Sequence, residues 1–190
     1  MGSLSSIGRT FYGIAIAGIV IVSIYYHKLP YILGPGLIPQ GSRLWHLPDW
    51  ENLAKVLTLA AGAPAISKGK IGRLGAVIFS LTIVYYGILH FMVAVEAASY
   101  IPSWIPYHLF WMYFCGAALI ASGIAIIIRT KQQLAAVLLG AMILTWFAIL
   151  HIPRVVVAPA AEMDGELNSA LFALAYSGTA FVISGAANKK

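Results

Sequence analysis

Histidines are the side chains best suited to chemistry in this sequence. There are five of them, at His27, His46, His90, His108 and His151. A neutral imidazole accepts or donates a hydrogen bond, binds metals, and changes its charge near neutral pH. The spacing of these histidines matches no metal-ligand motif, so we expect no metal site. No carboxylate pair, nucleophile–base pair or phosphate-binding glycine loop stands out, so we assign no catalytic residue and leave open whether the chain is an enzyme.

Three of the histidines occupy similar places, because each lies at the end of an apolar run. Other side chains suited to ligand binding follow them: Glu96 six residues after His90, and Arg154 three residues after His151. Aromatic rings stack on planar molecules, and histidine or arginine reaches the oxygens of such molecules. The pattern therefore predicts a ligand site formed by His27, His90, His151, Glu96, Trp111 and Arg154. The alternative is that these side chains line the membrane interface, where tryptophan and tyrosine gather.

The composition requires an apolar solvent for most of the surface. Of the 190 residues, 61% are hydrophobic and 9% are charged, whereas a soluble domain has about 25% charged residues. A soluble core of this chain length does not bury that much apolar surface, but a lipid bilayer surrounds it. The basic residues are scattered between apolar runs and not gathered on one face, which excludes nucleic acid as a partner.

Six apolar segments predict transmembrane helices, since a helix needs about 20 residues to cross the hydrocarbon. They are roughly residues 8–26, 50–66, 74–95, 107–128, 134–152 and 167–187. The second is the weakest, because it is short and contains Lys55 and Pro64. We predict an all-α, polytopic membrane helical bundle that forms one transmembrane domain over residues 1–190.

The charges predict an orientation for these six spans. Eight of the twelve basic residues would lie on one side: Arg9, Lys68, Lys70, Arg73, Arg129, Lys131, Lys189 and Lys190. All six acids would lie on the other: Asp49, Glu51, Glu96, Glu162, Asp164 and Glu166. Basic residues in short loops mark the cytoplasmic side. We therefore predict a multi-pass protein of the cell membrane with both termini in the cytoplasm.

An internal repeat supports the six-span interpretation. At a spacing of 61 residues, GILHF around His90 matches AILHI around His151, and Trp50 matches Trp111. At a spacing of 62 residues, CGAALIASGIA matches SGTAFVISGAA near the C-terminus. We predict three helical hairpins, roughly 8–66, 74–128 and 134–187. Small residues spaced four apart, such as Ala118 and Ser122, predict close helix packing.

The second half of the chain resembles a known family. YYGILHF, then IPSWIPYHLFWMYFCGAALIASGIAI over residues 101–126, a basic turn and a helix ending in LHIP are similar to the DoxX-like integral membrane proteins. LNSALFALAYSGTAFVISGA resembles the last span of the longer members. The family is named after a membrane subunit linked to thiosulfate:quinone oxidoreduction. The resemblance implies a helical bundle associated with quinone or electron transfer, and it transfers no catalytic residue.

Three functions remain open on the sequence. The first is a redox-associated subunit that contacts quinone, its cofactor, near the outer face of the membrane, together with a membrane or peripheral redox partner protein. The second is a small-molecule or ion transporter, although the spans contain few ionisable residues. The third is a membrane scaffold for a partner protein. The single cysteine, Cys115, excludes a dithiol within the chain.

Overall fold

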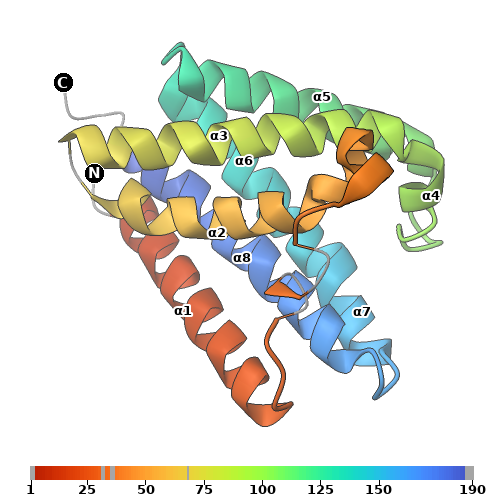
Figure 1. The fold of residues 1–190 in the computed structure, drawn as a ribbon. Helices are drawn as coiled ribbons and strands as arrows, with labels where there is room; N and C mark the ends of the chain where they lie inside the picture. Colours follow the sequence, from red (N-terminus) through yellow and green to blue (C-terminus); the bar gives the residue numbers. More distant parts are fainter. Residues whose placement is uncertain (1–2, 31–32, 35–36, 68, 187–190) are drawn as a thin grey trace.

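The computed structural model describes residues 3–30, 33–34, 37–67 and 69–186, and within these ranges all regular secondary structure is helical (Figure 1). Five segments are long and apolar enough to cross a bilayer: Ser3–Tyr25, Gly69–Met92, His108–Ile127, Gln132–Val157 and Met163–Ala186. The chain is therefore a multi-pass membrane protein whose outer surface contacts lipid. The predicted end of the last span at residue 187, together with Lys68, Lys189 and Lys190, lies outside the described residues.

Five helices form a closed ring. In order around it, α2 (Glu51–Ile66) packs on α3 (Gly69–Met92), α3 on α5 (His108–Ile127), α5 on α6 (Gln132–Trp146), α6 on α8 (Met163–Ala186), and α8 on α2. The first helix, α1 (Ser3–Tyr25), packs along α8 outside this ring (Figure 1). This placement leaves α8 with neighbours on several sides, and it explains why most of its residues from Asn168 to Ser184 are buried.

Glycines allow the helix pairs to approach closely. A Cβ atom built on Gly8 of α1 would lie 2.5 Å from the carbonyl oxygen of Gly178 on α8. A Cβ on Gly87 of α3 would lie 2.8 Å from the carbonyl oxygen of Gly116 on α5. In lipid, helices are held together mainly by such close packing, because the lipid tails are as apolar as the side chains.

The core lies inside the ring and takes side chains from all five of its helices. Phe79, Ile83, Leu139 and Ile183 are among its largest fully buried side chains. The buried serine hydroxyl groups in this region bind main-chain carbonyls; the Ser177 hydroxyl, for example, donates to the Gly140 carbonyl on α6 at 2.9 Å. These serine hydroxyls are thus satisfied within the bundle, as an apolar surrounding requires.

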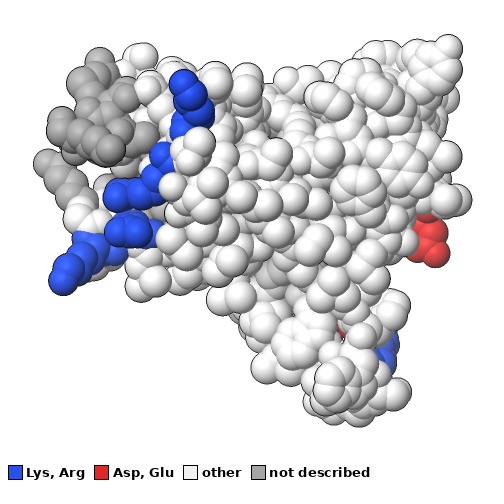
Figure 2. Space-filling model, turned by 90° about the horizontal axis from the view of Figure 1, so that it is seen from above, with Lys and Arg blue, Asp and Glu red and all other residues white. Residues whose placement is uncertain are grey.

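The two ends of the bundle carry opposite charge. The start of α1, the α2–α3 turn, the α5–α6 turn and the end of α8 lie together at one end (Figure 1), and lysine and arginine side chains gather there (Figure 2). We call this the basic end. The carboxylates Asp49, Glu51, Glu96, Glu162, Asp164 and Glu166 lie on the segments at the opposite, acidic end.

Of the four α-helices in the described residues up to Ala98, two are too short to cross a membrane alone. One is α2, whose 16 residues extend about 24 Å, against about 30 Å of hydrocarbon. It lies alongside α3 (Figure 1). The other is α4 (Ala94–Ala98), a single turn after α3.

The three predicted hairpins have different neighbours. The second is a packed pair of α3 and α5, and the third a packed pair of α6 and α8. In the first, α1 packs along α8, and its contact with α2 includes Tyr12, whose hydroxyl donates to the Leu59 carbonyl at 2.8 Å. The equivalence of the three hairpins stays a prediction.

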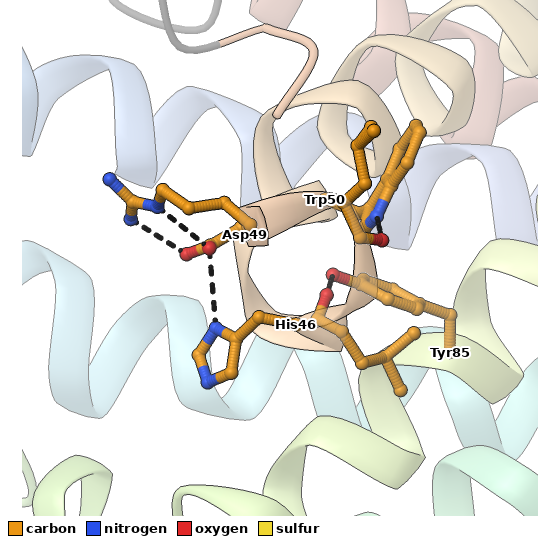
Figure 3. Close-up of polar contacts among 7 residues, drawn as sticks. His46, Asp49, Trp50 and Tyr85 are labelled. Carbon is orange, nitrogen blue, oxygen red and sulfur yellow. Dashed lines mark hydrogen bonds and ion pairs between the residues drawn. The ribbon is translucent and has the colours of Figure 1, made fainter. Parts of the chain in front are cut away.

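A folded segment at the acidic end leads into α2. It consists of two short 3-10 helices, η2 (Gly41–Trp45) and η3 (Leu47–Trp50). The Asp49 carboxylate binds the Arg43 guanidinium and lies 3.3 Å from Nδ1 of His46, while the hydroxyl of Tyr85 on α3 donates to the Leu47 carbonyl at 2.9 Å (Figure 3). The hydrogen bond from Tyr85 fixes this segment against the end of α3.

Candidate functional site: a cavity at the acidic end

A cavity of about 510 Å³ opens within the helical ring toward the acidic end. We call it the acidic-end cavity. Its wall is mostly apolar and comes from all five ring helices and from the segments that follow α3 and α6. The polar side chains relevant to binding are His90, His151, Arg154, Glu166, Glu51 and Lys55. An apolar cavity with a few polar groups is the usual form of a small-molecule site.

His90 lines the cavity from the last turn of α3. Its Nδ1 lies 2.8 Å from the Tyr86 carbonyl oxygen, one helical turn earlier. A carbonyl only accepts, so Nδ1 carries the hydrogen of this bond. In the neutral ring, Nε2 is then a hydrogen-bond acceptor. His90 therefore offers a ligand an acceptor held in a fixed orientation.

His151 owes its position to a change of helix type. After α6, residues Phe147–His151 form one turn of π-helix, η4, in which the Ile152 N–H donates to the Phe147 carbonyl five residues earlier. Pro153 follows at the start of α7 (Ile152–Val157). A proline has no N–H and its ring clashes with the carbonyl four residues before it, so the wider turn accommodates it. The sequence HIP thus explains the irregular turn.

The ring of His151 has an unused polar atom. Its Nδ1 is buried and has no hydrogen-bond partner within the described part of the chain. Leaving a buried polar atom unsatisfied costs about 1–3 kcal/mol. A ligand that forms a hydrogen bond with this Nδ1 would remove that cost. His151 is therefore the strongest candidate for a ligand contact.

An ion pair joins α7 to α8 at the cavity. The Arg154 guanidinium donates two hydrogen bonds to the Glu166 carboxylate, from Nε to Oε2 at 2.9 Å and from Nη2 to Oε1. The guanidinium also lies over the Tyr100 ring, 4.7 Å from its centroid. A two-point arginine–carboxylate contact fixes geometry as well as charge. Arg154 is therefore held by the protein, with its remaining N–H groups left for a ligand.

Two tryptophans form an aromatic part of the wall. Trp111 of α5 and Trp146 of α6 meet edge to face, with ring centroids 6.2 Å apart. Trp146 Nε1 donates to the Sγ atom of Cys115 at 3.0 Å, and this cysteine is buried. The contact fixes the indole plane in the wall, and it gives Cys115 a structural partner.

The structure brings together four of the six residues predicted from the sequence. His90, His151, Trp111 and Arg154 line the acidic-end cavity. His27 is exposed beyond the end of α1, and Glu96 is exposed on α4; neither lines this cavity. The three equivalent histidines therefore do not converge here.

Sequence reasoning missed Glu166 and Trp146 as members of the site. The signal for Glu166 was an acidic residue in the first turn of the last span, in a chain whose spans are otherwise almost free of carboxylates. Glu51 and Lys55 were also missed; they form an ion pair of 2.8 Å, four residues apart on α2. Among the described residues, no group of three or more histidine, cysteine or acidic side chains is arranged to hold a metal ion.

The arrangement is suited to binding and orienting a planar molecule. The tryptophans supply flat apolar faces, and His90, His151 and Arg154 supply hydrogen-bonding atoms. It contains no nucleophile activated by a neighbouring base among the described residues. Comparison of the chain with protein families, with curated proteins and with solved structures finds no match.

Proposed function

We propose that this chain is a DoxX-like membrane protein that binds a quinone head group in the acidic-end cavity, as a redox-associated subunit. The observation that carries the proposal is the buried, unpartnered Nδ1 of His151 in a mostly apolar wall. A quinone has a flat ring for the tryptophan faces and two carbonyl oxygens that accept hydrogen bonds. The resemblance of residues 85–187 to the DoxX-like proteins supports the same ligand.

The polar groups of the wall match both redox forms of such a ligand. A protonated Nδ1 of His151 would donate to a quinone carbonyl, and Nε2 of His90 would accept from a hydroquinone hydroxyl. The Arg154–Glu166 pair would keep the polar side of the site in place without adding net charge. An apolar quinone tail would extend along the apolar part of the wall.

We further propose six spans with both termini in the cytoplasm. The N-terminal start of α1 and the start of α3 lie at the same end of the bundle, so α2 is the segment that returns the chain across it. Lys55 lies near the acidic end of α2 and pairs with Glu51, which eases the burial of a short span. The concentration of arginine and lysine at the basic end supports a cytoplasmic location for that end.

Quinone binding tests the function directly. Purified protein in mild detergent is titrated with a short-chain quinone, and binding is followed by quenching of tryptophan fluorescence, since Trp111 and Trp146 lie in the wall. We expect His151→Ala and His90→Ala each to weaken binding by about 1–3 kcal/mol, because each removes a hydrogen bond to the head group.

Two control variants test whether the loss of affinity is specific to the histidines that line the cavity. His46 and His27 are exposed and do not line the cavity. His46→Ala and His27→Asn should leave the quinone affinity unchanged; asparagine is chosen for His27 because that residue has a φ of 51°, which asparagine tolerates. Equal affinity in all four variants, with intact folding, would refute the proposed site.

A further inference from the structure

A second cavity, of about 720 Å³, lies at the basic end, away from the quinone site. We call it the basic-end cavity. Three arginines line it from three different segments: Arg9 on α1, Arg73 on α3, and Arg129 just after α5. Residues far apart in the sequence are thus brought to one place by the packing of the helix ends.

These arginines have no acidic partner within the described part of the chain. The ion pairs found there all involve Asp49, Glu51, Asp164 or Glu166, which belong to the acidic end. The sequence contains six acidic side chains, and none of them lines the basic-end cavity. In Figure 2 most blue side chains gather at one end, and the red side chains lie at the other, together with a smaller blue patch. The cavity therefore has an excess of positive charge.

Helix starts add to the positive potential. The N-termini of α1, α3 and α6 lie at this end, and none of the three has an acidic residue in its first turn. By contrast, α2, α4 and α8, which begin toward the acidic end, carry Glu51, Glu96, and Asp164 with Glu166 in theirs. Free N–H groups at a helix start attract anions. The three helix starts at the basic end therefore have no acidic side chain in their first turns to offset the positive potential; α5, which begins toward the acidic end, also has none.

The rest of the wall is partly polar, with Ser5, Ser6, Ser67 and Gln132, and partly apolar. Ile66, Val77, Ile126, Ile127, Val182 and Ile183 line the same cavity. A cavity of this volume holds more than a free phosphate ion, and a partly apolar wall beside arginines fits a molecule that is anionic at one end and apolar at the other. Arginine is suited to phosphate because its planar fork donates two hydrogen bonds at once.

We propose that the basic-end cavity binds a phosphate group, with Arg9, Arg73 and Arg129 as its ligands. The apolar part of the wall favours a phospholipid of the adjoining leaflet as the source of this phosphate, and free phosphate is the other source. Pockets that are basic and lie between membrane helices bind anionic lipid head groups in this way.

The test compares lipids on the intact protein. Delipidated protein in detergent is titrated with phosphatidylglycerol, with phosphatidylcholine of the same acyl chains, and with inorganic phosphate, and bound species are counted by native mass spectrometry. We expect the wild-type protein to bind phosphatidylglycerol more tightly than phosphatidylcholine. Each of Arg9→Gln, Arg73→Gln and Arg129→Gln should weaken phosphatidylglycerol binding about fivefold, the usual contribution of one basic residue.

Matched variants distinguish a site from diffuse surface charge. Lys70 and Lys131 lie at the same end but do not line the cavity. Lys70→Gln with Lys131→Gln removes the same charge as Arg73→Gln with Arg129→Gln, and we expect the lysine pair to change binding less than twofold. Equal loss in both pairs would overturn the proposal.

The three titrations also identify the source of the phosphate. Preferential binding of phosphatidylglycerol, with inorganic phosphate competing only weakly, indicates a lipid. Binding of inorganic phosphate with the same arginine dependence, and no preference between the two lipids, indicates free phosphate. Equal binding of the two lipids together with no binding of inorganic phosphate would overturn the proposal, and this comparison needs only the wild-type protein.

Discussion

Asp49 holds together the segment that leads into α2. Arg43 donates to its carboxylate from Nε at 2.9 Å and from Nη2 at 2.8 Å (Figure 3). These hydrogen bonds lower the pKa of Asp49 from 3.8 to about 2, with a smaller contribution from His46, and the same contact raises the pKa of Arg43. The folded segment thus favours the ionised carboxylate over the protonated one.

The lowered pKa of Asp49 predicts how acid affects this segment. A group whose pKa is lower in the folded state stabilises that state above its ordinary pKa, and the contribution is lost as the pH falls through the folded value. We therefore expect the full contribution above about pH 4 and its loss as the pH approaches about 2. The midpoint for Asp49 is measured by NMR of its carboxyl carbon.

A charge variant tests the cause of that shift. Arg43→Gln removes the two hydrogen bonds, so the titration midpoint of Asp49 should rise toward the ordinary value of about 3.9. Lys28→Gln is the control, because Lys28 pairs with Asp164 at 3.6 Å and not with Asp49. A midpoint that does not move in Arg43→Gln would show that the arginine is not the cause.

Which helices pack on each other in this bundle depends more on the local fit of their surfaces than on their hydrophobicity. All the spans are apolar, so hydrophobicity alone favours lipid and protein neighbours about equally. The contact of α1 with α8 depends on Gly8 and Gly178, where the main chains approach each other. The face of α1 that carries Gly8 therefore packs on α8, and the opposite face lies in lipid.

Two glycines of α1 provide a matched test. A Cβ on Gly8 would lie 2.5 Å from the Gly178 carbonyl oxygen, whereas a Cβ on Gly13 meets nothing within 4 Å. We expect Gly8→Ala to destabilise the protein by about 1–3 kcal/mol through overpacking. Gly13→Ala should leave stability unchanged or slightly higher, since alanine is the better helix former. Thermal unfolding in detergent measures both, and equal midpoints would contradict this account of the interface.

The separation of charge along the bundle supports the proposed orientation in a membrane. Basic side chains at one end and acidic ones at the other agree with an inner and an outer surface. The two cavities open toward these different ends. The proposed quinone site and the proposed phosphate site would thus face opposite leaflets.

Cysteine labelling tests this topology. In a Cys115→Ala background, single cysteines replace the exposed residues Ser3, Ser42, Ser103 and Thr130. A membrane-impermeant thiol reagent should label positions 42 and 103 in intact cells, and positions 3 and 130 only after lysis, because six spans place the latter two in the cytoplasm. Labelling of position 130 in intact cells would contradict the proposed orientation.

The sequence by itself determined the helical class, the membrane environment and most spans. In lipid, the main-chain N–H and C=O groups of a long apolar run must form hydrogen bonds within the protein. A helix forms all of them within one segment. The described spans agree with the predicted ones within a few residues, although α3 begins at Gly69 and the α6–α7 span continues to Val157. These features depend on residues that are close together in the chain, so the sequence alone predicts them.

The tertiary structure alone decided which residues share a site. His90, His151, Trp111 and Arg154 meet in one cavity, while His27, just beyond the end of its helix, remains exposed because α1 packs outside the ring. Glu166 reaches Arg154 only because α7 and α8 lie side by side. When a helix is apolar on every face, its sequence does not indicate which other helix it contacts. Close-fitting glycines such as Gly8 and Gly178 select that neighbour, and their match is visible only in three dimensions.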